Sequence, residues 1–248
     1  MLGARRSRTV PWHPLDLLPE VLYDPAILDH TITGSGISLK PNEGTLGSAF
    51  DMQQTTDSLR PAFSASHADL NGRAAIIGDG ADYLIQATAN AGLDNADGEI
   101  LTVVIVFRHT VANDYIWASD LITPASARFD VESNTAGYAH WSYAGNDGLA
   151  NAMTVNVVNC GRWEVDTATN HRTTRVNDLA NDDTTNYGAM DTGAQGLKWC
   201  LLGRPTYAGP FTGQLGFLMH IRRLLTAPEL AKLTTWVNAQ FGLSLASV

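Results

Sequence analysis

The stretch Ile100-Leu101-Thr102-Val103-Val104-Ile105-Val106-Phe107 decides the fold class of this 248-residue chain. Every residue in it except Thr102 is apolar, and most are β-branched, which favours extended backbone. A strand with one solvent-exposed face would alternate apolar and polar residues, and this stretch does not. We therefore predict a central β-strand that is covered on both faces.

Segments with strand character recur on both sides of this stretch, with turn-forming residues between them, as is typical of a β-sandwich. The strongest turn signal is Asn71-Gly72, because both residues tolerate positive φ. Gly78-Asp79-Gly80-Ala81-Asp82 predicts a turn that leads into a further strand, and residues 33–48, rich in Gly and Ser, predict a loop. Further strands are predicted at 115–118, 126–132, 139–143, 154–158, 172–177, 199–202 and 214–222.

The last of these strands alternates, and one helix follows it. We expect Leu215, Phe217, Met219 and Ile221 on one face, and Gln214, Gly216, Leu218, His220 and Arg222 on the other. Thr226-Ala227-Pro228-Glu229 is a capping box, and Gly242 supplies a helix stop. The helix should pack on the sandwich through residues at helical spacing: Leu230, Leu233, Val237 and Phe241. The prediction is an all-β fold, an antiparallel β-sandwich with one short C-terminal α-helix.

Composition fits one globular domain and argues against two classes of partner. Hydrophobic residues make up 44% of the chain and charged residues 17%, and the formal net charge is −9. An acidic surface repels nucleic-acid phosphates, so no nucleic acid is expected as a partner. No run approaches the roughly 20 apolar residues that a membrane span needs, and no signal-peptide pattern is visible, so we expect no membrane partner.

The N-terminus is basic, in contrast to the rest of the chain. Arg5, Arg6 and Arg8 precede the first acidic residue, Asp16. The three prolines among residues 11–19 exclude a regular helix or a central strand, while Trp12, Leu15 and Leu17 could pin the segment onto a sheet face. We predict a docking arm at 1–19, with Arg5, Arg6, Arg8 and Trp12 as its contact residues, and a sandwich at 20–248. A merely solvated terminus is the alternative.

Two groups of short motifs stand in order on either side of the central strand. They are Arg60-Pro61-Ala62, Asn71-Gly72-Arg73-Ala74-Ala75 and residues 78–84, then Leu202-Gly203-Arg204-Pro205, Phe211-Thr212-Gly213-Gln214-Leu215 and the capped helix to Leu243. This order resembles the concanavalin A-like (laminin-G-like) lectin/glucanase domains, and the resemblance implies a jelly-roll sandwich. The chain departs from the family's Trp and Gly-rich turn at residues 39–44, where Leu39-Lys40-Pro41-Asn42 stands.

Domains that this chain resembles are common in bacteriophage virion proteins and bacterial surface proteins. The resemblance and the basic arm together predict a non-catalytic structural or accessory protein of a bacteriophage particle, a head decoration or a tail protein. It would be made in the host cytoplasm, form a homo-oligomer, bind other virion subunits through the arm and need no cofactor. A cell-surface glycan is a possible ligand. The alternatives are a free-standing carbohydrate-binding module and a glycoside hydrolase of the same fold.

A glycanase on this fold uses an E-x-D-x-E pattern, because alternate residues of a strand point into one cleft. Glu164 and Asp166 supply the first two carboxylates, but Ala168 stands in the third position. Hydrolysis by that route therefore lacks its acid/base, and we expect no enzyme activity.

The candidate glycan site is an aromatic patch. A flat ring covers the apolar face of a sugar, and neighbouring polar groups bind its hydroxyls. The candidate residues are Tyr138, His140, Trp141, Tyr143, Asn146 and Asp147. Core packing or subunit contact is the alternative role of these residues.

The sequence predicts no metal centre, because the histidines are scattered and the two cysteines are far apart. Asn181-Asp182-Asp183 either helps to bind calcium through hard oxygens or forms a surface turn. Cys160 and Cys200 fit a reducing compartment, but a disulfide stays open if their strands turn out to be neighbours.

Overall fold

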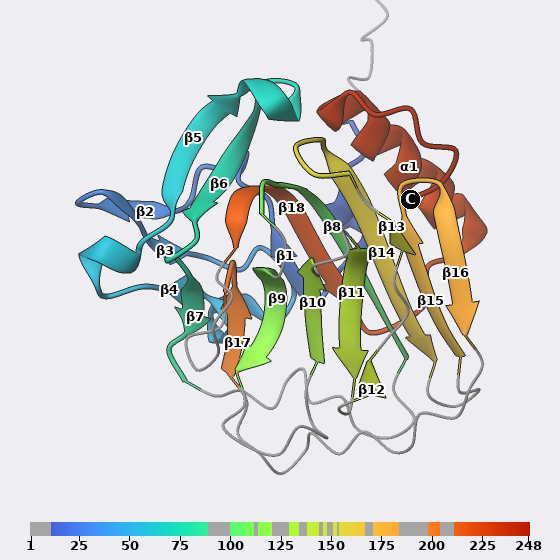
Figure 1. The fold of residues 1–248 in the computed structure, drawn as a ribbon, viewed down its shortest axis with the longest axis horizontal. Helices are drawn as coiled ribbons and strands as arrows, with labels where there is room; N and C mark the ends of the chain where they lie inside the picture. The colour runs from blue at the N-terminus through green and yellow to red at the C-terminus, as the bar shows by residue number, and fades with distance from the viewer. Residues whose placement is uncertain are drawn as a thin grey trace, which may run out of the picture.

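Two antiparallel sheets face each other, and helix α1 (Ala227–Phe241) covers the outer side of one of them (Figure 1). The predicted β-sandwich with a C-terminal helix is confirmed, and α1 is the only α-helix in the part of the chain that the structure describes. This computed structural model describes residues 11–88, 100–111, 114–120, 129–133, 138–143, 146–147, 151–152, 154–166, 171–183, 198–203 and 211–248.

The sheet beneath α1, sheet A, has the order β16-β15-β14-β8-β18-β6-β5, and β1 also pairs with β18. The predicted strand at residues 100–107 is β8, which lies between β14 and β18. The strands of sheet A are β1 (Val21–Tyr23), β5 (Ala62–His67), β6 (Arg73–Asp79), β8 (Ile100–His109), β14 (Asn159–Asp166), β15 (His171–Val176), β16 (Leu179–Asp183) and β18 (Thr212–Ile221).

The second sheet, sheet B, has the order β12-β11-β10-β9-β17-β7-β4-β3-β2, and β13 also pairs with β11. Its strands are β2 (Thr31–Thr33), β3 (Gly36–Lys40), β4 (Met52–Gln53), β7 (Leu84–Gln86), β9 (Asp114–Asp120), β10 (Phe129–Ser133), β11 (Tyr138–Tyr143), β12 (Asn146–Asp147), β13 (Asn151–Ala152) and β17 (Lys198–Leu201). Short 3-10 helices lie at η1 (Pro14–Leu17), η2 (Gly47–Phe50), η3 (Asp57–Leu59) and η4 (Ala68–Leu70).

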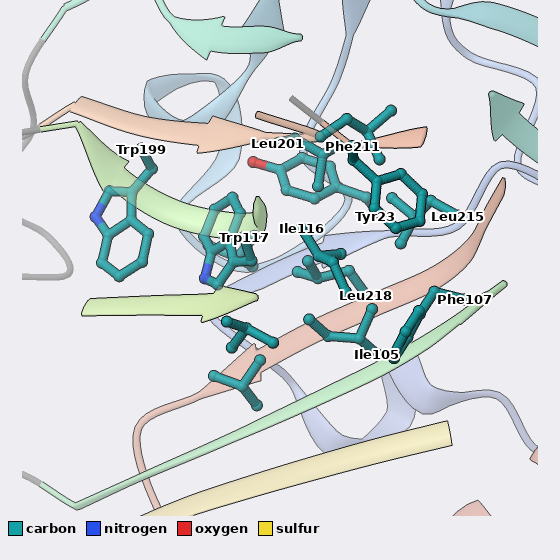
Figure 2. Close-up of a cluster of buried hydrophobic side chains, with 14 of the residues drawn as sticks. Tyr23, Ile105, Phe107, Ile116, Trp117, Trp199, Leu201, Phe211, Leu215 and Leu218 are labelled. Carbon is teal, nitrogen blue, oxygen red and sulfur yellow. The ribbon is translucent and has the colours of Figure 1, made fainter. Parts of the chain in front are cut away.

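Strand β8 is apolar on both faces because each face closes a separate core. Ile105 and Phe107 enter the core between the two sheets, together with Trp117 of β9 and Leu218 of β18 (Figure 2). Val104 and its alternate neighbour Val106 enter a second core, between sheet A and α1. The prediction of a central strand covered on both faces is therefore confirmed.

Strand β18 does not alternate as the sequence predicted. A β-bulge shifts its register against β8 between Leu215 and Phe217. Leu215 and Leu218 therefore share the core between the sheets, whereas Phe217 packs under α1. The expected single face from Leu215 to Ile221 is wrong, because the extra residue in the bulge reverses the alternation at that point.

Two predicted segments around the sheets are also wrong. Residues 33–48 are not one loop, because β3 occupies Gly36–Lys40. Gly34 adopts positive φ in the turn that joins β2 to β3. Residues 154–158 do not form a strand, because Asn156 adopts φ 66° and its N–H donates to the carbonyl of His109. Val155 and Val157 are exposed on this turn, 37% and 42% respectively, so their β-branched side chains were a misleading signal.

Cys160 and Cys200 form no disulfide and lie in different sheets, Cys160 in β14 and Cys200 in β17. Their strands are not neighbours, which settles the open question of a disulfide. Burial raises the pKa of the Cys160 thiol to about 12, so this side chain behaves as a small apolar group. Within the described residues, no helix is long and apolar enough to cross a membrane.

The capped helix begins and ends as predicted. The backbone N–H and the hydroxyl of Thr226 both donate to the Glu229 carboxylate, at 2.8 and 2.9 Å. Arg223 donates to the same carboxylate from two nitrogens, and these bonds lower the pKa of Glu229 to about 2. Gly242 ends the helix at φ 67°, in the left-handed region that an L side chain adopts only with strain.

Replacing Thr226 with alanine is expected to lower the free energy of unfolding by about 1 kcal/mol, because the hydroxyl contact to Glu229 is lost. Urea denaturation followed by circular dichroism measures the change. Thr235→Ala is the matched control, since Thr235 is exposed on the same helix and its hydroxyl only bonds the Ala231 carbonyl. Equal losses in the two variants would mean that the cap contributes nothing specific.

Candidate functional site

The predicted aromatic patch lies on β11 and β12, at one end of sheet B. The backbone register pairs Trp141 with Val131 of β10, and Tyr143 with Asn146 of β12. The side chains of Tyr138, His140, Trp141, Tyr143, Asn146 and Asp147 lie outside the described ones. The patch therefore stays a prediction.

The predicted arm divides between undescribed and described residues. Arg5, Arg6 and Arg8 lie outside the described residues. Trp12 packs against the core beneath α1, and Leu17 is buried in that core. The segment that follows the arginines is thus fixed on the sandwich, as the pinning prediction expected.

The predicted carboxylate pair lies on β14, at the outer face of sheet A. Trp163 and Val165 enter the core between the sheets, so Glu164 and Asp166 share the opposite face. The Glu164 carboxylate lies 3.3 Å from Nε of Arg162. Ala168, in the position where a third carboxylate would stand, is outside the described residues.

Asn181-Asp182-Asp183 belongs to strand β16, which pairs with β15. The expected surface turn is therefore wrong at these residues. The turn is at residues 177–178, where Asn177 adopts positive φ. Among the described residues, no group of three or more His, Cys, Asp or Glu side chains is placed to hold a metal ion.

A groove of about 740 Å³ lies between the N-terminal segment and α1. One wall is formed by residues 11–13 and the other by α1, and Arg73 at the start of β6 lies between them. The lining residues of the groove are Pro11, Trp12, His13, Arg73, Ala231, Lys232, Thr235, Trp236, Ala239 and Gln240.

A buried ionic network holds the two walls together. Asp24 is only 1% exposed and accepts two hydrogen bonds from Arg73, both 2.7 Å long. The imidazole Nε2 of His13 lies 3.2 Å from the same carboxylate, and its Nδ1 accepts from the N–H of Leu15. Since Nδ1 accepts, Nε2 carries the proton and donates to Asp24. Arg73 also donates to Oε1 of Gln240 on α1.

The network sets the electrostatics of the groove. Burial alone would raise the pKa of Asp24, but the His13 hydrogen bond and the Arg73 charge outweigh it, and the pKa is lowered. Asp24 is therefore ionised at neutral pH, and its charge is neutralised by Arg73. Lys232, exposed on the rim, has no carboxylate within 4.0 Å among the described residues.

Aromatic side chains form the floor of the groove. Trp236 is 7% exposed, the Arg73 guanidinium lies over its ring at 5.2 Å, and the His13 ring meets it edge-on at 5.4 Å. Trp12 is only partly buried, and it is the aromatic surface that a ligand can reach. An aromatic platform beside fixed polar groups is the composition of a small-ligand site.

Sequence reasoning singled out Trp12 but not the groove. Trp236 follows Leu233 by three residues, so helical spacing places it on the buried stripe of α1. That signal was available, and it identifies Trp236 as a core residue rather than a groove residue. Arg73 and His13 meet at Asp24 and at the Trp236 ring, contacts between distant segments that no local pattern encodes.

No family model and no curated protein matches this sequence. Solved structures do match. The sialidase of Trypanosoma rangeli, in complex with the inhibitor DANA, matches with a TM-score of 0.54 and 10% identity, over 86% of this chain and 32% of that one.

Two further structures match less closely. The CBM40 module of the Ruminococcus gnavus IT-sialidase, bound to α2,3-sialyllactose, has a TM-score of 0.46 and 17% identity, over 55% of this chain and 83% of that one. The NanB sialidase of Streptococcus pneumoniae, as its K499G mutant, has a TM-score of 0.46 and 13% identity, over 59% of this chain and 27% of that one. The chain thus spans about a third or less of the two sialidases. At these identities the likeness shows the fold alone, a lectin-like β-sandwich.

Proposed function

We propose that this protein is a non-catalytic, carbohydrate-binding accessory protein of a bacteriophage particle, attached by its N-terminal arm. The observation that carries the binding function is the groove between the N-terminal segment and α1. It offers Trp12 as a stacking surface and places it beside Lys232 and Gln240, which can donate hydrogen bonds to sugar hydroxyls. The lectin-like fold supports the same function. A free-standing carbohydrate-binding module remains the second candidate, since it needs the same groove.

The attachment role is supported by the way residues 11–17 are fixed. Trp12 and Leu17 pack into the core beneath α1, and His13 is hydrogen-bonded to Asp24. Arginines immediately before a fixed segment lose less conformational entropy on docking than arginines on a long free tail. Their guanidinium groups suit an acidic surface on a neighbouring subunit.

Deletion of residues 1–10 is expected to leave the thermal unfolding midpoint unchanged, because the described cores begin at Trp12. The truncated protein should co-sediment poorly with particles that lack the protein, whereas full-length protein co-sediments. Binding of the full-length protein should weaken as salt rises, since arginine contacts to an acidic surface are screened. Equal co-sedimentation of both forms would move the attachment surface to the sandwich.

The proposal of no catalysis is tested at Glu164 and Asp166. The double variant Glu164→Gln/Asp166→Asn should behave like the wild type in assays of glucan and galactan cleavage, with no turnover in either. Turnover in the wild type that disappears in the double variant would identify a glycanase. A circular dichroism spectrum matching that of the wild type controls for folding.

The binding function is tested on a glycan array with the full-length protein, followed by calorimetry on each glycan that is retained. Trp12→Ala should abolish retention, because it removes the accessible aromatic surface. The proposed function would be contradicted if the array retained no glycan and calorimetry detected no binding at glycan concentrations up to about 1 mM.

A further inference from the structure

We infer that the groove selects anionic glycans, those that carry a carboxylate or a sulfate, over their neutral counterparts. This inference rests on the proposed function and adds a ligand class to it. It is carried by the unused hydrogen-bonding capacity of the groove and by its local charge.

Most of the hydrogen-bonding capacity that the groove leaves unused is in donors. Arg73 donates to Asp24 through Nη2 and to Gln240 through Nη1, and its Nε is buried, so the donors that a ligand can reach are those of Gln240 and Lys232. The Gln240 oxygen accepts from Arg73, so the free part of this amide is its NH₂ group. Lys232 adds an ammonium group on the rim, with three donors and no acceptor.

The charged acceptor near the groove, the carboxylate of Asp24, is already engaged. Both oxygens of Asp24 accept from Arg73, and one of them is also within hydrogen-bond reach of His13. Asp24 is buried, so it offers nothing to a ligand. The Thr235 hydroxyl donates its proton to the Ala231 carbonyl within the helix, so its oxygen can still accept from a ligand. The donors of Lys232 and Gln240 outnumber this acceptor, so a ligand group that only accepts, such as a carboxylate or a sulfate, matches the lining better than a hydroxyl does.

The local charge at the groove also favours an anionic ligand. The protein has a formal net charge of −9, so an anionic ligand is repelled by most of its surface. At the groove, the carboxylate of Asp24 is cancelled by Arg73, and the charge of Lys232 stays uncompensated by the described residues. A carboxylate or sulfate beside Lys232 therefore gains a charge-assisted hydrogen bond, while the rest of the ring stacks on Trp12.

The deciding experiment compares ligands that differ only in charge. Trigalacturonate and its neutral methyl ester are titrated into full-length protein by calorimetry, after an array of acidic glycans with their neutral counterparts. We expect acidic glycans to bind at least about tenfold more tightly, and Lys232→Glu to abolish that preference. The preference should also shrink as salt is raised.

Three variants localise the binding. Trp12→Ala should weaken the binding of acidic and neutral ligands alike, whereas Lys232→Glu should weaken the binding of acidic ligands far more than that of neutral ones. Trp141→Ala, in the patch predicted from the sequence, is the matched aromatic control and should change neither. Because Trp12 also packs on the core, unfolding midpoints of all variants are measured. Lys232 is exposed, so its variant tests the inference without a folding defect.

The outcomes separate the inference from the proposed function. Equal affinity for acidic and neutral ligands would overturn the anionic selectivity and leave carbohydrate binding in place. Binding that is lost in Trp141→Ala but kept in both groove variants would overturn the groove as the site, again without touching the function. An absence of any binding on the array and in calorimetry would overturn both.

Discussion

Replacing Phe241 with alanine is expected to lower the free energy of unfolding by about 4 kcal/mol. The ring is 3% exposed, lies 6.0 Å from the Trp236 ring, and has the Arg73 guanidinium 5.3 Å from its centroid. Its removal leaves a cavity where α1 meets sheet A, and the packed strands beneath cannot collapse into it. Urea denaturation followed by tryptophan fluorescence and circular dichroism measures the loss.

A second substitution tests whether the cavity is the cause. A Cβ added at Gly216 would lie 2.6 Å from Cε1 of Phe241, so Gly216→Ala alone should overpack the site. In the Phe241→Ala background the same methyl group enters vacated space. The double variant should therefore be more stable than the sum of the single effects predicts, with a coupling of about 1–3 kcal/mol.

The control for hydrophobic loss alone is Leu224→Ala, since Leu224 is 40% exposed just before the helix. It should change the free energy of unfolding by less than about 0.5 kcal/mol. Losses of similar size at Phe241 and Leu224 would mean that α1 is peripheral to the fold.

The elements that sequence predicted correctly are those in which a local pattern has one physical solution. An uninterrupted apolar strand such as β8 has to be covered on both faces, and the capping box at Thr226 has one geometry. The errors arise where a single residue changes the register. The bulge in β18 places Leu215 and Phe217 in different cores, although two-residue spacing predicts one face.

The groove could not be predicted because its parts come from three distant segments. Trp12 was predicted to hold the N-terminal segment down, and the structure shows that contact. The role of Arg73 depends on Asp24, 49 positions earlier, and on Gln240, 167 positions later. Neither pairing leaves a periodic signal. A local pattern reveals only side chains that are close along the chain, such as the aromatic cluster around Trp141.

The second large loss of stability is expected when the ionic network beneath the groove is broken. Asp24→Asn is expected to lower the free energy of unfolding by about 3 kcal/mol at pH 7, because it leaves the largely buried Arg73 without its counter-charge. Asp57→Asn is the matched control, since its carboxylate is 59% exposed and pairs with Arg60 at the surface. That change should cost less than about 1 kcal/mol. Both are measured by urea denaturation.

The pH dependence of the stability lost in Asp24→Asn identifies the charge of Asp24 as the cause of the loss. The pKa of Asp24 is lowered in the folded state, so its stabilising contribution is present above its ordinary pKa of 3.8 and is lost as pH falls below it. Burial lowers the pKa of His220 to about 3, so both proteins lose stability below its ordinary pKa of 6.5. The His220 contribution is the same in the wild type and in Asp24→Asn, so it cancels when their free energies of unfolding are compared.

The difference in stability between wild type and Asp24→Asn should therefore stay constant from pH 7 to about pH 5 and shrink below about pH 4. A difference that stays constant through pH 3 would mean that asparagine fails through shape rather than charge. The same variant should weaken the binding of neutral glycans, although Asp24 touches no ligand, because His13 and Arg73 lose the carboxylate that fixes the two walls. Affinity should fall for Asp24→Asn and hold for Asp57→Asn, since only the first carboxylate joins the N-terminal segment to β6.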